Sequence, residues 1–457
     1  MYLRRYLRLH PFDTSTEVGR AAERYRLAAW TTLASAASKG SIMLVMVLSV
    51  SLTIPYLGPQ RFGIWMTVAS LAAMLSFLGL GVGSALTNHV AHRASEGDRT
   101  LLRRAISGGL GFLVALGLMV AAGLCLLAIS LPWGSLIKVD DASLQLEARN
   151  AATVFAVLFG LNLLTTGIQS VFSGLQRAFE AHLATALGAL ISLGVLVLAA
   201  QQRAGIPALL AVTMGIPLLS LLSLLLVLVR RQLFSFREIG LAVRQEARGL
   251  LRVGGLFFVL QIGTMIGWGA DAIIIASALG PTQVAVYSVV QRFFQFLTQP
   301  LAMGNMPLWS AYADAHAKGD VGFIRRTLKA SMLLTVTLAL VGALVFFLSS
   351  RWLLHYWTGG SVEVPMLLTA AVALWAVFES CGGAFAMFLN GMQVVRQQVV
   401  VAVVFCILLL PLKLFGVNQV GLIAIPLSTI VVYALTHLYF YGFVFYPRIK
   451  SLLTNSR

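Results

Sequence analysis

Leu57-Gly58-Pro59-Gln60-Arg61-Phe62-Gly63-Ile64-Trp65 decides the fold, because it returns 222 residues later as Leu279-Gly280-Pro281-Thr282-Gln283-Val284-Ala285-Val286-Tyr287. A Gly-Asp pair followed by two arginines recurs at the same offset, as Gly97-Asp98 with Arg103-Arg104 and as Gly319-Asp320 with Arg325-Arg326. A third echo, Gly174-Leu175-Gln176 and Gly391-Met392-Gln393, has an offset of 217. Several elements held in one register indicate a tandem repeat.

The composition is that of a membrane protein. Of the 457 residues 59% are apolar and 11% are charged, with a mean hydropathy of +0.88, whereas soluble proteins are about a quarter charged. Runs of roughly 20 apolar residues, each long enough to span a bilayer, recur throughout. We predict twelve such spans: 31–54, 62–86, 105–130, 150–172, 183–200, 207–229, 253–279, 283–306, 328–349, 364–388, 398–415 and 421–445. Backbone polar groups must be satisfied in hydrocarbon, and the alternation of a barrel strand is absent, so these spans are expected to be helices.

The repeat offset covers six spans, an even number, so the two halves are expected to run parallel about an axis along the membrane normal. The predicted architecture is therefore an all-α polytopic protein with an N-lobe (1–229), a basic connector (230–252) and a C-lobe (253–457) around a central cleft. Repeats of this kind are typical of transporters, in which the lobes give alternating access to a substrate between them.

The net charge of +17 is explained by the topology of the chain in the membrane and not by nucleic-acid binding. With the amino terminus in the cytoplasm, 25 of the 33 Lys and Arg residues fall on the inner side, and six, among them Lys413, fall in outer loops. This is the positive-inside bias. It predicts a protein of the cytoplasmic membrane with both termini and the connector inside, and residues 131–149 as the longest outer loop.

The chain resembles polysaccharide and O-antigen flippases of the Wzx type, in the multidrug/oligosaccharidyl-lipid/polysaccharide exporter superfamily. The resemblance rests on the two Leu-Gly-Pro turns with their aromatic residues, on the Gly-Leu-Gln-Arg turn at Gly174 to Arg177, and on residues 307–320. It implies a transporter, not an enzyme, that moves a polyprenyl-pyrophosphate-linked oligosaccharide during lipopolysaccharide or other surface polysaccharide synthesis. Membrane lipids and the polysaccharide polymerase machinery are the partners it suggests.

Four ionisable residues lie deep in predicted spans, where charge is expensive and usually functional. They are Lys39, Asp271, Arg292 and Glu379. In one interpretation Asp271 pairs with Arg292, and Lys39 pairs with Glu379. In the other, Lys39 and Arg292 present positive charge to the lipid pyrophosphate, whose negative charge a cation can compensate. The resemblance to the flippases implies such a cation-lined central cavity. Asp271 and Glu379 are then charge-pairing or coupling residues.

Asn162 occupies the position that matches Glu379 at the offset of 217 and is a candidate for sugar binding or for a hydrogen bond between helices. We predict no cofactor and no metal. The run from Gly79 to Gly83 lacks the Lys-Ser/Thr of a phosphate-binding loop.

Two other functions stay open. A cation-coupled multidrug antiporter of the same superfamily is expected to carry an acidic residue in its first lobe, and none of the first six predicted spans contains Asp or Glu. An integral-membrane polysaccharide polymerase is expected to need a large outer loop or an acidic motif at the membrane edge, and Asp140-Asp141 is the only outer acidic pair, in a short loop.

Overall fold

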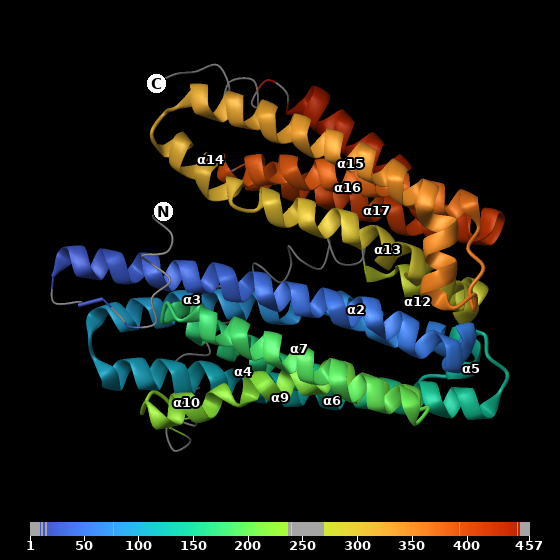
Figure 1. Ribbon diagram of the computed structural model, residues 1–457, viewed down its shortest axis with the longest axis horizontal. Coiled ribbons are helices and arrows are strands. Elements are labelled where there is room, and N and C mark those ends of the chain that lie inside the picture. The colour runs from blue at the N-terminus through green and yellow to red at the C-terminus, as the bar shows by residue number, and fades with distance from the viewer. Residues whose placement is uncertain are drawn as a thin grey trace. The chain divides into compact units, whose positions relative to one another are not determined.

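The computed structural model describes residues 10, 12–13, 16–75, 77–235, 239, 269–392, 394–445 and 447. Most of the connector 230–252, the first part of the span predicted at 253–279 and nearly all of the carboxyl-terminal tail lie outside the described residues. Every element in the described part is helical (Figure 1). The all-α prediction is therefore confirmed.

The chain divides into two compact units. The first comprises 1–56, 71–133 and 140–261, and the second comprises 57–70, 134–139 and 262–457. The helices that contribute to the first unit are α2 (Glu17–Leu75), α3 (Phe77–Glu96), α4 (Arg99–Ser130), α6 (Ala142–Gly174), α7 (Ala178–Gln201), α8 (Ile206–Leu210), η1 (Ala211–Gly215), α9 (Ile216–Leu222) and α10 (Leu224–Arg230). The second unit contains residues 57–70 of α2, near the end of that helix, as well as α5 (Trp133–Ile137), α12 (Asp271–Leu279), α13 (Pro281–Asn305), α14 (Leu308–Ala317), α15 (Val321–Thr358), α16 (Met366–Gly391), α17 (Val395–Val420), η3 (Gly421–Ile423), α18 (Ala424–Tyr433), η4 (Ala434–Leu438) and η5 (Phe440–Val444).

In the described residues, eight helical segments are long and apolar enough to cross a membrane. They are Ala29–Ala72, Arg99–Ser130, Ala142–Gly174, Ala178–Gln201, Ile206–Arg230, Val321–Thr358, Met366–Gly391 and Arg396–Val444. The first and last of these are 44 and 49 residues long, and each covers parts of two predicted spans. The chain is a multi-pass membrane protein, and the count of twelve spans stays a prediction.

The Leu-Gly-Pro echo has the same backbone geometry in both copies. Gly58 has φ 71° and ψ 167° and bends α2, while Gly280 has φ 86° and ψ 170° and separates α12 from α13. Only glycine adopts this region readily. In the first copy, Gly63 lies close to the backbone of Pro281. A Cβ added to Gly63 would lie 1.7 Å from the carbonyl oxygen of Pro281, so no larger residue fits at this position.

The Gly-Asp echo is a helix start in both copies. Gly97 and Gly319 have φ values of 78° and 70°. The carboxylate of Asp98 accepts hydrogen bonds from the backbone N–H groups of Thr100 and Leu101 at the start of α4, and that of Asp320 accepts one from Phe323 at the start of α15. An Asp at this position satisfies amide groups that have no partner within the helix.

The glycine of the third echo lies at a contact between two helices in each half: α6 with α3 in the first, and α16 with α14 in the second. A Cβ on Gly174, at the end of α6, would lie 2.7 Å from the carbonyl oxygen of Thr87 and 2.9 Å from Val90 Cβ. Gly391, which ends α16, is equally close to its neighbours. A Cβ added to Gly391 would lie 2.9 Å from the carbonyl oxygen of Trp309 and 2.4 Å from Tyr312 Cβ. Thr87 and Val90 are 222 residues before Trp309 and Tyr312, so the repeat extends from sequence to packing.

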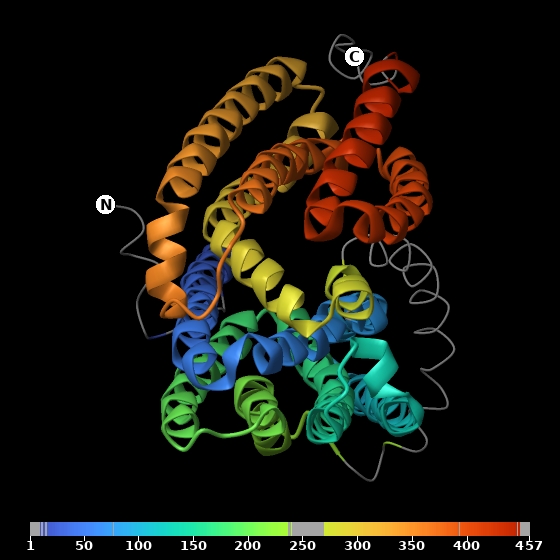
Figure 2. The ribbon, with the colours of Figure 1, turned by 90° about the vertical axis from the view of Figure 1, so that its right-hand side faces the viewer.

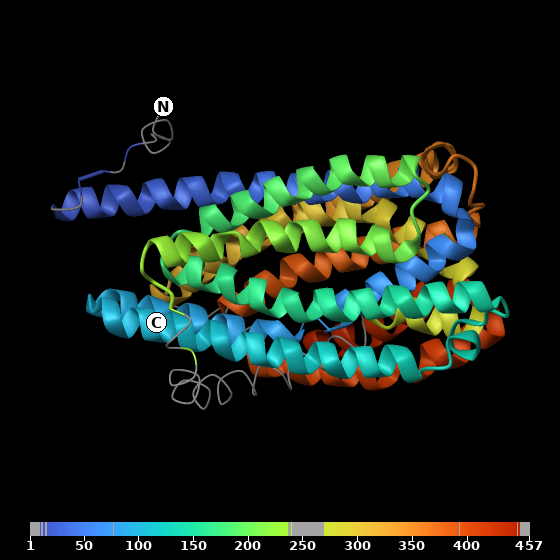
Figure 3. The ribbon, with the colours of Figure 1, turned by 90° about the horizontal axis from the view of Figure 1, so that it is seen from below.

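Long helices pack lengthwise in each unit. In the first unit α4 lies along α6 (Figure 3), where Gly117 and Gly160 face each other so closely that a Cβ on either would lie 2.5 to 2.6 Å from the other's carbonyl oxygen. In the second unit α15 and α13 each pack against α16 (Figure 2). Small residues at such crossings allow close backbone approach in a membrane.

Two predicted boundaries are wrong. Residues 131–149 do not form one long loop, since they contain α5 and the first turns of α6, which begins at Ala142 after the capping residue Asp141. Lys413 does not lie in an outer loop. It belongs to α17 and its side chain is buried, because the helix continues to Val420, beyond the end of its most apolar part.

Candidate functional site

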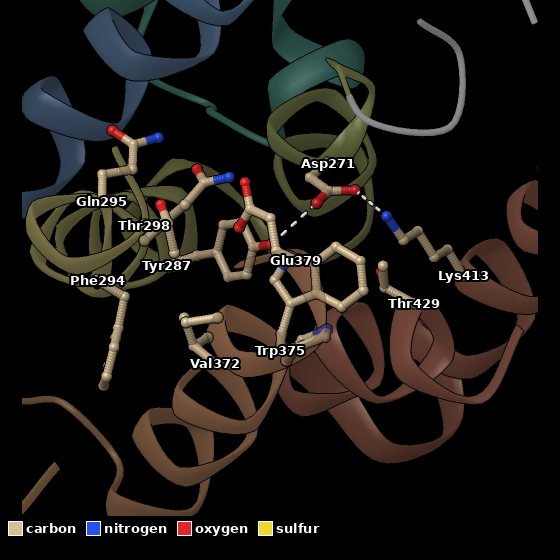
Figure 4. A pocket seen from close by; sticks show the side chains of 13 residues that line it. Asp271, Tyr287, Phe294, Gln295, Thr298, Val372, Trp375, Glu379, Lys413 and Thr429 are labelled. Carbon is tan, nitrogen blue, oxygen red and sulfur yellow. Dashed lines mark hydrogen bonds and ion pairs between the residues drawn. The ribbon is translucent and has the colours of Figure 1, made fainter. Parts of the chain in front are cut away.

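A cavity of about 70 Å³ opens in the second unit, between α12, α13, α16, α17 and α18. Polar side chains from all five of these helices line it, within a part of the chain that is otherwise strongly apolar (Figure 4). Polar groups are concentrated inside a membrane-spanning region mostly where function or pairing requires them. This cavity is therefore the candidate functional site.

An ion pair forms one wall of the cavity. The carboxylate of Asp271, at the start of α12, accepts hydrogen bonds from Lys413 Nζ at 2.5 Å and from the Tyr287 hydroxyl at 2.9 Å (Figure 4). Asp271 is 9% exposed and Lys413 is 2% exposed. A buried ion pair of this kind requires both partners, since either charge alone would be stranded in a medium of low dielectric.

A polar stripe on α13 forms a second wall. Tyr287, Gln291, Gln295 and Thr298 follow one another at spacings of four, four and three residues, and all four line the cavity. This spacing places side chains on one face of a helix. The amides of Gln291 and Gln295 and the hydroxyl of Thr298 form no hydrogen bond with any residue that the structure describes. Their hydrogen-bonding capacity is open to the cavity.

The third wall comes from α16. Trp375 and Glu379, one turn apart, both line the cavity, and the indole ring of Trp375 meets the Tyr433 ring edge to face at 5.5 Å. The carboxylate of Glu379 forms neither a hydrogen bond nor an ion pair within the described part of the chain, and its side chain is exposed to the cavity. The cavity therefore holds one paired acid, Asp271, and one acid that faces its open space.

The structure brings together two of the predicted residues, Asp271 and Glu379, and corrects the pairing of one. In one of the two interpretations of the sequence Asp271 pairs with Arg292, but among the described residues its partners are Lys413 and Tyr287. Arg292 lies on α13 directly after Gln291, is half-buried and does not line the cavity. The neighbours along α12 and α13 suggested the wrong cation because the true partner comes from α17.

Lys39 and Asn162 belong to the other unit. Lys39, on α2, is half-buried. Asn162, on α6, accepts hydrogen bonds at its backbone carbonyl from Thr165 and Thr166 at 3.0 and 2.8 Å. Its side-chain amide is half-buried and bonds to no residue in the described ranges.

Sequence reasoning missed Lys413, the polar stripe and Trp375. A signal for the lysine was present, because the predicted span 398–415 contains it. The stripe also left a signal, since Tyr287, Gln291, Gln295 and Thr298 follow the helical period inside a predicted span. Trp375 left none, because one tryptophan in an apolar run does not differ from a packing residue.

A second hollow, of about 640 Å³, lies in the first unit at the start of α7 and the amino-terminal part of α2. Apolar side chains, among them Trp30 and Phe179, line it together with Arg26 and Arg177. Both arginines are in ion pairs, Arg26 with Glu23 and Arg177 with Glu180. The hydrogen bond to Glu23 raises the pKa of the Arg26 guanidinium.

Comparison with known proteins gives one family and one fold. Residues 28–312 match a family described as polysaccharide biosynthesis protein, while no curated protein matches the chain. An inward-facing multidrug resistance MATE family transporter of the MOP superfamily aligns with 93% of this chain and 100% of its own, with a TM-score of 0.76 at 14% identity. The lipid II flippase MurJ, in an inward closed conformation, aligns with 93% of this chain and 90% of its own, with a TM-score of 0.71 at 12% identity. At these identities the likeness is one of fold.

Proposed function

The chain belongs to the polysaccharide biosynthesis protein family, and from this we propose that it carries a lipid-linked oligosaccharide across the cytoplasmic membrane during the synthesis of a surface polysaccharide. The family match over residues 28–312 carries the proposal. The fold, shared with a structure described as a lipid II flippase, and a polar cavity within apolar helices support it. An O-antigen or another lipopolysaccharide precursor is a substrate of this class.

In this proposal the N-lobe (1–229) and the C-lobe (253–457), joined by the connector 230–252, alternate in opening a central cleft to the two sides of the membrane. Lys39 and Arg292 attract the pyrophosphate of the polyprenyl carrier, since positive charge compensates phosphate. Asn162 contributes hydrogen bonds to the substrate. A polysaccharide polymerase is the machinery that would receive the product on the outer side.

A strain that lacks its own flippase for a defined glycan provides the test. Expression of this chain together with the matching glycosyltransferases should restore the surface polysaccharide and remove the lipid-linked precursor from the inner leaflet. An inserted, stable protein that leaves the precursor unflipped with every glycan tried would refute the proposal.

The second candidate is a cation-coupled multidrug antiporter, which the likeness to a MATE transporter and the two acids of the cavity, Asp271 and Glu379, favour. Drug susceptibility separates the two. In a strain without its main exporters, the antiporter should raise the inhibitory concentration of several cationic drugs, whereas the flippase should leave it unchanged.

We further propose that both termini and the connector face the cytoplasm, as the 25-to-6 distribution of Lys and Arg implies. Single cysteines at positions 240 and 141 can be introduced after replacing Cys125, Cys381 and Cys406. A membrane-impermeant maleimide added to intact cells should label position 141 and not position 240. The reverse pattern would invert the topology.

A further inference from the structure

The open hydrogen-bonding groups of the cavity in the second unit require a partner. Gln291, Gln295 and Thr298 face it from α13 and bond to no described residue. Polar groups that face a cavity within an apolar region need a hydrogen-bonding partner, because leaving them without one is unfavourable. A ligand that enters the cavity and displaces water from such groups must offer equivalent hydrogen-bonding groups.

The chemistry of the lining selects the ligand. An amide has both donors and acceptors, a carboxylate such as Glu379 accepts, and the indole of Trp375 adds an apolar ring face. Among the described lining residues, the one cation, Lys413, is bound to Asp271. A phosphate needs donors and positive charge. A sugar hydroxyl, which donates and accepts at the same oxygen, matches this set better.

The size agrees with a single ring. A volume of about 70 Å³ has room for roughly five waters, and five waters take up about 150 Å³ as liquid. This is the size class of one monosaccharide. A whole oligosaccharide is larger, so the cavity would take one residue of it.

We propose that this cavity is a subsite for one neutral sugar ring of the transported lipid, an inference that rests on the proposed function. Gln291 and Gln295 exchange hydrogen bonds with the ring hydroxyls, Glu379 accepts from another hydroxyl, and Trp375 covers an apolar face of the ring. The pyrophosphate is bound elsewhere, because the cation among the described residues that line this cavity, Lys413, is already paired with Asp271.

The test compares the double variant Gln291→Ala/Gln295→Ala with Gln299→Ala, which removes the same amide from an exposed position of α13 outside the cavity. Purified protein in nanodiscs is titrated with methyl glycosides of glucose, galactose, mannose, N-acetylglucosamine and N-acetylgalactosamine by saturation-transfer NMR. Binding of sugar-free undecaprenyl diphosphate is measured by native mass spectrometry.

At least one glycoside should bind wild type and Gln299→Ala alike and bind the double variant about tenfold or more weakly, since each neutral hydrogen bond contributes about 1 kcal/mol. Diphosphate binding should be unchanged. The single variants, each expected to weaken binding about threefold or more, replace the double variant if it does not fold.

Three results would overturn the subsite: no glycoside binds wild type, the double variant binds as well as wild type does, or it loses diphosphate binding to the same degree. Restoration of surface polysaccharide by wild type is scored separately. Glycoside binding that depends on the two glutamines in a protein that flips nothing would uphold the sugar subsite and refute the proposed function.

Discussion

Lys413 shows how a full positive charge is kept within an apolar helix. Its ammonium group has almost no exposure and is bound to Asp271, whose carboxylate also accepts from Tyr287. The pair joins α12, α13 and α17 at one point. Because each charge is buried, neither group is easily replaced alone, whereas the pair can be removed together at a smaller loss of stability.

We therefore expect Lys413→Met to destabilise the protein by about 3–5 kcal/mol, since it strands the Asp271 carboxylate with Tyr287 alone. Asp271→Asn combined with Lys413→Met should regain most of this loss, because the amide oxygen still accepts from Tyr287 and no charge is left. The apparent melting temperature in detergent, from fluorescence-detected size-exclusion chromatography, measures both.

Lys329→Met is the matched control, because Lys329 is an exposed lysine in α15, and it should melt as wild type does. A Lys413→Met protein as stable as this control would mean that Asp271 is solvated. Asp271→Ala combined with Arg292→Ala is not expected to keep wild-type stability, since that change leaves Lys413 without Asp271.

Asp271 and Glu379 could be predicted as site residues because a carboxylate in an apolar run is visible in the sequence. The partner of Asp271 could not be predicted in this way. Lys413 lies 142 residues away along the chain, and only the packing of α17 against α12 brings it there. Arg292 was the nearer candidate in sequence and was wrong for that reason.

The bend in α2 and the break before α13 depend on glycine. Gly58 and Gly280 have positive φ with ψ near 170°, and a Cβ at either position would meet no atom within 4 Å. A substitution by alanine should therefore act through backbone strain alone, of about 1–3 kcal/mol. We expect Gly58→Ala and Gly280→Ala to lower the apparent melting temperature.

Gly40 provides the comparison. It lies in the same helix as Gly58, has ordinary helical geometry, and a Cβ there would also meet nothing within 4 Å. Gly40→Ala should be neutral or stabilising by up to about 1 kcal/mol. Equal effects at Gly40 and Gly58 would show that the bend does not need a left-handed residue.

The helix cap at Asp141 is expected to respond to pH. Hydrogen bonds from Ser143 hold the pKa of the Asp141 carboxyl below its usual range. A lowered folded-state pKa gives stability that is present above the unfolded-state pKa and is lost as pH falls through the folded-state value. The advantage of wild type over Asp141→Asn should therefore narrow as the pH drops below about 4.

Melting temperatures of the two proteins at pH 7 and pH 3 give this difference. Asp140→Asn serves as the control, since Asp140 is exposed and caps no helix in the described ranges. A gap between wild type and Asp141→Asn that is the same at both pH values would show that the charge of Asp141 does not stabilise the start of α6.

Element boundaries could be predicted where a local rule fixes them. The conformation of a turn glycine or of a capping Asp depends only on its neighbours in the chain. All of these residues lie between predicted spans: the glycines at 58, 97, 280 and 319 and the caps at Asp98 and Asp320. The region 131–149 could not be predicted, because a helix can continue beyond its apolar part wherever a cap such as Asp141 and good helix formers allow it.

At the scale of the whole molecule, the two halves repeat their packing as well as their motifs. Gly174 meets Thr87 and Val90, and Gly391 meets the residues 222 positions later in the chain. Val90 corresponds to Tyr312, so the glycine accommodates partners of very different size. A duplicated half that kept its helix crossings while its side chains diverged explains why the match is confined to short motifs.

The proposed cation-lined cleft leads to a prediction about transport. Lys39→Ala and Arg292→Ala should leave the protein inserted and stable but reduce delivery of glycan to the outer face, because they remove charge that compensates phosphate. Arg292→Glu should reduce it further, since it adds repulsion. Surface polysaccharide in the complemented strain is the measurement, normalised to membrane protein.

Arg351→Ala is the control for loss of an arginine, because Arg351 is an exposed residue of α15, and it should transport normally. Full transport by Lys39→Ala and Arg292→Ala together would exclude both residues as ligands of the pyrophosphate. They would then be structural, and phosphate recognition would have to be sought elsewhere in the chain.

The close contact of Gly63 with Pro281 has a consequence for how the protein is made. The two residues are far apart in the order of translation, and at 5–20 residues per second the ribosome needs roughly 10–40 s to add the roughly 200 residues between them. For that time the segment 57–70, which packs in the second unit, lacks its partner. The nascent chain must be sheltered by lipid or an insertase until the partner emerges.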